Sequence, residues 1–455
     1  MPSVSPFPSP SRGQQERQRI PPPPDPIQRF ILALKGQNVT TATIDNSGKK
    51  TRRKKQVDYS STILEKLFDA VRWLTRSKQA FVDYSTVWMV GINEFCKDRE
   101  NMSSYVDDSE DFKHVSFNLQ QLLHAHSIDS SIGDEWKSEL MACFEALAKS
   151  TKRFEQVILA LISQPPEDDI IGNLASQMSS LRSATCSNDQ TAIKSRLHDI
   201  ARLVVPGGEL RPSFGSTVGK HEVGFSHPQI ARLLIPLKYL ALLESDYEGT
   251  IANISAGALP VTDDLFPAHL YPLGTKYNPK NISKGLFRGH AWILAYKIIF
   301  TAPSSAKTIS YKEVAHKSKA RTNKLRHVTP KTIAYACLHV TFAMSSTSTW
   351  KCDMSPFSKE QFYTNLVEVL TPDTKWRRSL FRMANELIFG RAEGLEIQPE
   401  LATTEGPSDI QLMAQQNEAN DNSDDDNDNE DEDEDEELRR LTPGLLLHPF
   451  LPLNS

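Results

Sequence analysis

The stretch "LFRGHAWILAYKIIFTAPSSAKT", residues 286–308, decides how the central part of the chain folds. Its apolar residues surround the expected helix on nearly every side instead of lining one face. A helix that is apolar all round is buried in a core. Gly285 and Gly289 are four residues apart, so they share a face at which another backbone can approach closely. We therefore predict a buried helix over residues 285–300.

The cations of this helix do not converge on one side. Lys284 and Arg288 are four residues apart and share one face, whereas His290 and Lys297 share a face nearly opposite to it. We expect Lys297 to extend its charged end from the buried helix into water, as long basic side chains commonly do. Arg288 is the better candidate for contact with an anionic ligand.

Helical periodicity extends over most of the chain between residues 60 and 390, without an alternating series that would predict strands. Helix signals support this pattern, since Thr329 can cap a helix that has Pro330 at its first position. Gly390 follows the last apolar residue, as a C-terminal stop should. Helices are also predicted over residues 229–235, 237–255, 330–345, 359–370 and 374–389. The expected fold is mostly α, a multi-helix globular bundle with disordered N-terminal and acidic C-terminal tails.

Composition divides the chain into successive parts. The first residues are rich in Pro, Ser and Arg, and the acidic run near the end repels itself, so neither can bury a core. We predict a disordered Pro-rich and basic tail (1–58), a helical region (59–165), a partly ordered connector (166–220), a helical domain with a basic segment (221–392) and a disordered acidic tail (393–455).

The formal net charge of −5 hides two blocks of opposite sign. Residues 421–437 contain 13 of the 57 acidic residues and no basic residue. The rest of the chain therefore holds 44 acidic residues against 52 Lys and Arg residues, which makes it basic.

The five cysteines are scattered and lack the CxxC spacing of zinc sites, which favours a reduced intracellular compartment. The N-terminus has no apolar core of a signal peptide, and no window approaches the ~20 apolar residues of a transmembrane helix. We therefore expect no secretion and no membrane partner. A cluster of six cations predicts nuclear localisation, with the cytoplasm as the alternative. These residues are Lys49, Lys50, Arg52, Arg53, Lys54 and Lys55.

Basic residues are concentrated between Lys276 and Lys331, which we call the basic segment. It holds thirteen Lys and Arg residues and one acidic residue, Glu313. A field of one sign attracts polyanions and raises the rate at which they associate. The basic segment is therefore predicted to bind nucleic acid or another polyanion. The alternative is an exposed loop whose charges point into water.

Hydroxyl groups and cations of this segment are the candidate anion contacts. Arg326 and His327 lie just ahead of a helix that should begin at Thr329, and N–H groups at such a helix end bind anions. The candidate nucleic-acid-binding residues are Arg288, Ser304, Ser305, Lys307, Arg321, Lys324, Arg326, His327 and Thr329.

Motifs of known catalytic sites are missing from the sequence. It has no GxSxG, HExxH, P-loop or protein-kinase motif, and no cluster with metal-ligand spacing. We therefore expect no cofactor and no metal. An enzyme with an unrecognised site stays open as an alternative, because residues distant in sequence can meet in a fold.

Three motifs carry a resemblance to a known family: "GFSHPQIARLLIP" (224–236), "GLFRGHAWILAYKIIFTAPSSA" (285–306) and "VTPKTIAYACLHVTFAMSSTSTW" (328–350). In this order they resemble a domain family of unknown function from mushroom-forming fungi. The resemblance covers about residues 195–390. It implies no activity, cofactor or site residue.

These features predict a non-enzymatic binding protein that engages nucleic acid or another polyanion. The protein would be nuclear if the cation cluster acts as a localisation signal. The acidic tail would compete with that ligand as a tethered polyanion. The main alternative is a helical protein–protein interaction module. In that case the Pro-rich segment and the C-terminal "PGLLLHPFLPL" would recruit protein partners, and both charged blocks would only keep the protein soluble.

Overall fold

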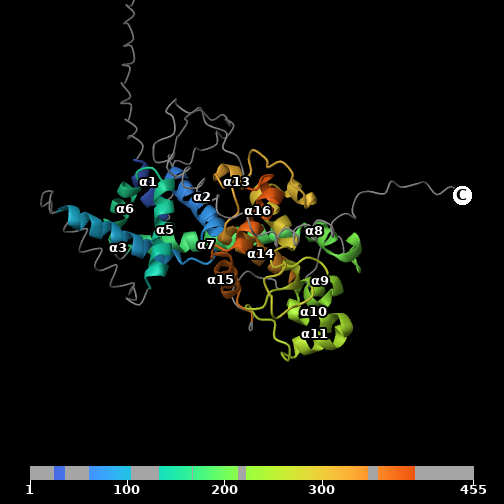
Figure 1. Cartoon of the computed structure of the whole chain (residues 1–455). Helices are drawn as coiled ribbons and strands as arrows, with labels where there is room; N and C mark the ends of the chain where they lie inside the picture. The colour runs from blue at the N-terminus through green and yellow to red at the C-terminus, as the bar shows by residue number, and fades with distance from the viewer. Residues whose placement is uncertain are drawn as a thin grey trace, which may run out of the picture. The chain divides into compact units, whose positions relative to one another are not determined.

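The computed structural model describes residues 25–35, 61–103, 133–165, 168–213, 222–346 and 357–394. All of them belong to the first of two compact units, residues 1–396. Within the described ranges the chain forms fifteen α-helices and no β-strand, apart from a single bridge between Pro236 and Pro267 (Figure 1). The prediction of a mostly α, multi-helix protein is confirmed. None of the described helices is long and apolar enough to cross a membrane.

A first core is built by helices from the N-terminal half. The ring of Trp88 is fully buried at its centre and packs against Phe144 and Phe154, with ring centroids 5.7 and 5.9 Å away. The helices that contribute are α1 (Pro26–Leu34), α2 (Ser61–Ser77), α3 (Tyr84–Ser103), α5 (Asp134–Ser150), α6 (Phe154–Ile162) and the first half of α7 (Ile170–Lys194).

Helix α7 links this core to a second one. Ile170 and Met178 near its start belong to the first core, whereas Cys186 and Ile193 near its end belong to the second. Residues 170–194 fall in the part of the chain that we predicted to be a partly ordered connector, and they form one continuous helix. Polar residues in the middle of α7 hide its apolar periodicity, and packing on both cores stabilises the helix as a whole.

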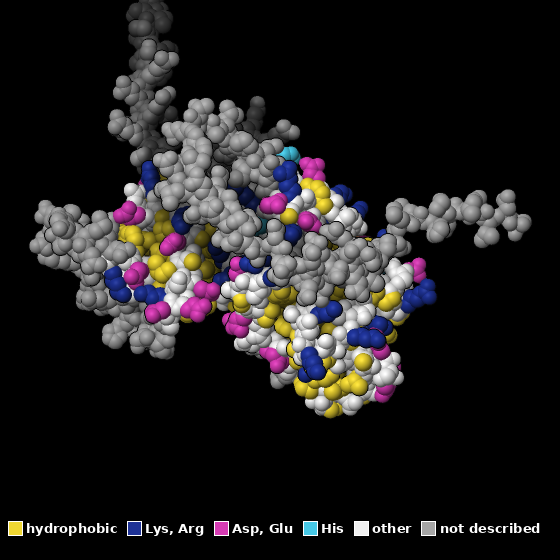
Figure 2. Space-filling model, viewed as in Figure 1, with side chains coloured by type: hydrophobic (Ala, Val, Ile, Leu, Met, Phe, Trp, Pro, Cys, Tyr) yellow, Lys and Arg dark blue, Asp and Glu magenta, His cyan; other side chains and the backbone are white. Residues whose placement is uncertain are grey.

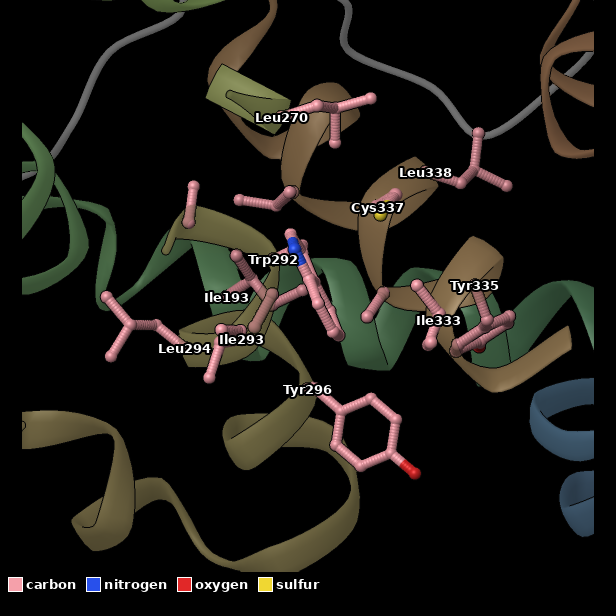
Figure 3. Packing of buried hydrophobic residues seen from close by; sticks show 14 of the residues in the cluster. Ile193, Leu270, Trp292, Ile293, Leu294, Tyr296, Ile333, Tyr335, Cys337 and Leu338 are labelled. Atoms are coloured by element: carbon pink, nitrogen blue, oxygen red, sulfur yellow. The ribbon is translucent and has the colours of Figure 1, made fainter. Parts of the chain in front are cut away.

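The second core surrounds α12 (Ala291–Tyr296) and α14 (Pro330–Met344). Every residue of α12 is buried. Trp292 and its neighbours in α12 lie beside Ile193 of α7 and Cys337 of α14 (Figure 3). The other helices that line this core are α8 (Leu197–Val204), α9 (Pro228–Leu234), α15 (Lys359–Leu370) and α16 (Lys375–Phe389).

The buried helix of the opening stretch is confirmed, but it begins later than predicted. Residues 285–289 form a turn in which Gly285 has φ +75° and Phe287 has φ 61°. Gly289 meets another backbone, since a Cβ there would lie 2.1 Å from the carbonyl oxygen of His269. The α-helix starts at Ala291 and continues as a π-helix over Lys297–Thr301.

Helix ends follow the local signals in the sequence. Thr329 forms a capping box with Thr332, and Gly390 ends α16 with φ 84°. One predicted helix is wrong, because residues 237–255 divide into a 3₁₀ turn, α10 (Leu240–Ser245) and α11 (Tyr247–Ser255), which lie side by side (Figure 1). The break is at Asp246, whose carboxylate accepts a hydrogen bond from the Gly249 N–H at 2.9 Å and caps α11.

A buried ionic network crosses from α2 to the second core. Asp189 of α7 accepts hydrogen bonds from Arg76 Nε at 2.6 Å and Arg76 Nη2 at 3.0 Å. It also accepts from the hydroxyl of Tyr335 at 3.0 Å and from Lys319 Nζ at 3.2 Å. Burial alone would raise the pKa of Asp189, but the hydrogen bonds and charge of Arg76, with Lys319, hold that pKa below its usual range.

This network joins four helices, because Lys319 lies in the short α13 (Lys319–Thr322) and Tyr335 in α14. Its two central members are almost fully buried, with the side chains of Arg76 and Asp189 exposed by 10% and 3%. A buried ion pair adds little net stability over an apolar pair, but removing one partner strands the other charge. The network therefore connects α2, α7, α13 and α14 through one buried carboxylate.

Replacing Asp189 with Ala should lower the free energy of unfolding by about 3–5 kcal/mol, because the Arg76 guanidinium is then buried without a counter-charge. Denaturant unfolding of the full chain measures this change. The matched control is Asp199→Ala, an exposed aspartate on the next helix, for which we expect a change of at most about 0.5 kcal/mol.

The double variant Arg76→Met, Asp189→Leu shows whether the lost stability comes from an unpaired buried charge or from lost packing. It should recover much of the loss, because no unpaired charge stays inside the protein. Equal losses in Asp189→Ala and in the double variant would show that the ionic network does not carry the effect.

Candidate functional site

The fold divides the basic segment into two exposed parts. The buried α12 and the π-helix that follows it lie between the loop of residues 272–285 and the loops of residues 303–329. The thirteen cations therefore do not form one continuous row. Several of them also have partners inside the protein, which reduces the charge that a ligand could meet.

Lys297 is the clearest of these internal cations. Its side chain is fully buried, so the expectation that it reaches water is wrong. Its Nζ donates hydrogen bonds to three consecutive backbone carbonyls, those of Thr308 at 3.1 Å, Ile309 at 2.8 Å and Ser310 at 2.7 Å. Burial lowers the pKa of Lys297 to about 8. The ammonium group fastens the following loop to the core instead of meeting a ligand.

Three further cations of the basic segment also bind within the fold. Lys331 pairs with Glu139 at 2.5 Å, and Lys319 belongs to the Asp189 network. Arg288 donates from Nη2 to the hydroxyl of Ser379 at 2.6 Å, and its Nη1 lies 3.8 Å from Met383 Sδ. Arg288 therefore ties the start of α12 to α16, although it is only partly buried.

The candidate hydroxyl groups are not equally accessible. Ser304 is exposed, but Ser305 is buried and its hydroxyl bonds to the Ala302 carbonyl at 2.6 Å and to the Thr301 hydroxyl at 2.7 Å. Thr329 is engaged by its capping box, in which it accepts from the Thr332 N–H at 3.2 Å. Ser304 is therefore the candidate hydroxyl most open to a ligand.

Four of the remaining candidates lie in α13 or directly after it. Arg321 is half-buried, whereas Lys324, Arg326 and His327 are exposed. The backbone of Arg326 packs against Gly394, since a Cβ at Gly394 would lie 2.1 Å from the Arg326 carbonyl oxygen. This contact brings the loop ahead of α14 next to the segment that follows α16.

A second loop reaches the same place. The ring of Tyr311 lies against Gly390, where a Cβ would be 2.8 Å from it, and the neighbouring Lys312 reaches the Ser304 carbonyl at 3.5 Å. We call the exposed cations of these loops the basic face: Lys307, Lys312, Lys317, Lys324 and Arg326.

The basic face is not purely positive. Figure 2 shows Lys and Arg side chains together with Asp and Glu side chains over the part of the surface where Figure 1 labels α13 and α16. Glu386 is exposed on α16, and Glu313 and Glu393 are exposed in the segments before α13 and after α16. The sequence therefore overstates the positive charge that a ligand would meet. Some of the cations bind groups inside the fold, and exposed glutamates offset part of the remaining charge.

Metal binding finds no support among the described residues, which contain no group of three or more His, Cys, Asp or Glu side chains placed to hold an ion. The localisation candidates Lys49 to Lys55, the Pro-rich segment and the acidic tail lie outside the described residues.

The roles of two residues in the site region were not predicted from the sequence. Asp189 was the more visible one, since it falls between Cys186 and Ile193 in the buried stripe of α7, where a charge needs a partner. No local pattern marks the role of Lys297, because it binds backbone carbonyls and every residue has one.

Two buried histidines make stability depend on pH. Burial lowers the pKa of His269 and of His339 to about 3. His269 Nε2 lies 2.8 Å from the hydroxyl of Thr341, and the ring of His339 packs on that of Tyr335, with centroids 4.2 Å apart. Neither ring takes up a proton at neutral pH in the folded state.

Replacing Lys297 with Met should lower the free energy of unfolding by about 1–3 kcal/mol, because the carbonyls of residues 308–310 lose their buried donor. Amide exchange should also become faster in the loop that carries Lys312. The control is Lys307→Met, an exposed lysine ten residues further on, which should leave both measurements unchanged. Equal effects of the two substitutions would contradict the anchoring role.

Acid should destabilise the protein well above the range in which carboxylates titrate. The pKa values of His269 and His339 fall from 6.5 in the unfolded chain to about 3 in the folded protein, so the unfolded state binds more protons between these values. Stability is therefore fully present above about pH 6.5 and falls as the pH drops below it.

Between about pH 7.5 and about pH 5, urea unfolding should show a loss of roughly 2 kcal/mol per histidine. The variant His339→Phe should remove about half of that loss. Asp189 acts only at lower pH, because its folded pKa lies below 3.8. A stability that is unchanged between the two pH values would contradict the prediction.

Comparison with known proteins finds one family model that matches the part of the chain around the second core. Residues 180–389 match the model of a family whose description is "Family of unknown function (DUF6698)". This confirms the resemblance seen in the three motifs, while the fungal origin stays a prediction. No curated protein and no solved structure matches the chain. The part of the chain from the second half of α7 to the end of α16, including the basic face, is thus the part that matches this family of unknown function.

Proposed function

We propose that the chain is a non-enzymatic binding protein that engages nucleic acid, or another polyanion, through the basic face. One observation carries the proposal: five exposed cations lie in the chain segments before and after α13. Such cations can approach phosphate groups and release the counterions bound to them, which drives association at low salt.

The cations near the end of α16 have a second explanation that needs no ligand. The C-terminal end of α16 carries partial negative charge, which favours nearby cations whether or not a ligand binds. This effect fades within one turn of the helix end. Cations on both sides of α13 and in the loop of residues 303–312 extend further than the dipole of α16 requires.

A nuclear location is part of the same proposal, and it rests on the six cations between Lys49 and Lys55. Such clusters are read as nuclear-localisation signals and also lie on phosphate backbones. A nuclear protein that carries a second cationic surface would meet nucleic acid at high concentration.

Removing the charge of the basic face should weaken binding to double-stranded DNA at low salt. The variant is Lys307→Gln, Lys312→Gln, Lys324→Gln, Arg326→Gln, and titration of a labelled duplex at several salt concentrations measures it. Each phosphate contact contributes about 0.9 to the slope of log K against log salt, so this slope should fall by up to about 3–4. The control replaces four exposed cations elsewhere, with Lys66→Gln, Lys152→Gln, Arg202→Gln and Lys238→Gln.

Deleting residues 421–437 in the same titrations should tighten binding, because the deletion removes a tethered polyanion that competes with DNA. The proposal is wrong if neither the full chain nor the truncated chain binds DNA or RNA at about 50 mM salt. It is also wrong if the control substitutions weaken binding as much as those on the basic face.

A further inference from the structure

The other exposed part of the basic segment is the loop of residues 272–285, between the 3₁₀ turn Ala268–Leu270 and α12. The ends of this loop meet, because the Gly289 N–H donates to the Leu270 carbonyl at 3.0 Å. The hydroxyl of Tyr271 donates to the carbonyl of Ile282 at 3.1 Å, which fixes the far side of the loop to its base. The loop therefore leaves a buried base and returns to it, as an Ω-loop does, and loops of this kind are frequently functional.

Hydrogen bonds within the loop fix its shape. The side chain of Asn278 accepts from the Lys280 N–H at 3.0 Å, and that of Asn281 accepts from the Lys284 N–H at 3.1 Å. The hydroxyl of Thr275 donates to the Pro272 carbonyl at 2.8 Å. Because these bonds form without a partner, the loop would lose little conformational freedom when it binds one.

This ordered loop exposes large apolar side chains. Leu273, Tyr277 and Ile282 are 57%, 41% and 43% exposed, which makes them three of the six exposed large apolar residues in the described part of the chain. Exposed apolar residues scattered singly need no explanation, but three of them within ten residues of one loop are a concentration that points to an interaction surface.

Lysines alternate with these apolar residues. Lys276, Lys280 and Lys284 are all exposed, and no acidic residue occurs between Asp264 and Glu313. The loop therefore offers apolar and positive groups together, so a partner has to be both anionic and able to accept apolar side chains.

The shape of the loop restricts the partner further. Residues 276–284 are exposed without interruption, which suits a partner that offers a broad surface. Leu273 and Ile282 have no polar group to pair with a base and no ring to stack on one. A lipid bilayer accepts such side chains at the level of its headgroups, while anionic headgroups attract the lysines.

We propose that the loop of residues 272–285 docks on the surface of an anionic membrane. Leu273, Tyr277 and Ile282 enter the interface, and the three lysines contact the phosphate and carboxylate groups of the lipids. The expectation of no membrane partner rested on the lack of a long apolar segment. Docking through a surface loop does not require such a segment. This proposal does not depend on nucleic-acid binding, because the basic face uses other cations.

The test is co-sedimentation of the full chain with vesicles of phosphatidylcholine containing phosphatidylserine, and with vesicles of phosphatidylcholine alone. Binding should require phosphatidylserine and weaken with salt. The variant Lys276→Gln, Lys280→Gln, Lys284→Gln should bind roughly 100-fold more weakly, since each lysine near an anionic surface contributes about fivefold. The variant Leu273→Ser, Ile282→Ser should lose at least about tenfold.

Two controls match these variants. Leu242→Ser replaces a 48% exposed leucine on α10, and the quadruple basic-face variant removes exposed cations at the other surface. Both should bind vesicles as the unchanged chain does, and thermal unfolding should show that every variant is folded. The proposal is overturned if the unchanged chain does not bind phosphatidylserine vesicles, or if Leu242→Ser reduces binding as much as the loop variants.

The DNA titrations tell the two anionic partners apart. If the loop lysine variant weakens DNA binding as much as the basic-face variant, while vesicles are not bound, the loop belongs to a nucleic-acid surface and the membrane proposal is wrong. If vesicle binding depends on the loop and DNA binding is absent, the membrane proposal stands and the proposed function fails.

Discussion

A carboxylate inside a helical protein has to be compensated before the helices around it can pack. Asp189 meets this requirement with Arg76, Lys319 and Tyr335, each from a different helix. Apolar contacts between helices tolerate small shifts, whereas a guanidinium fork and two further donors fit a single arrangement. One charge in the last third of α7, the helix that the two cores share, therefore connects helices from both of them.

Several charged side chains of the basic segment bind other groups of the protein itself. Lys297, Lys319 and Lys331 are bound to carbonyls or carboxylates of the chain itself, and Arg288 is bound to α16. What is left for a partner is divided between the basic face and the loop of residues 272–285. These surfaces differ in character, because the basic face mixes cations with glutamates, whereas the loop mixes lysines with apolar side chains and has no acid.

Local features could be predicted from the sequence, and long-range ones could not. The cap at Thr329, the stop at Gly390 and the burial of α12 are encoded within a few residues, so the helices were found. The partner of Asp189 is 113 residues away in Arg76, and Lys297 binds main-chain atoms that every residue possesses. For the same reason the sequence showed that the basic segment is cationic, but not which cations reach water.

The contact of Lys297 with backbone carbonyls also bears on how this region can vary. An anchor that recognises main-chain oxygens does not itself require particular side chains at residues 308–310, although Ile309 also packs on the second core. Substitutions of Thr308 or Ser310 should therefore keep the attachment of the loop if its path is kept, whereas position 297 needs a long donor. The surface next to the core can therefore change its chemistry while its position stays fixed.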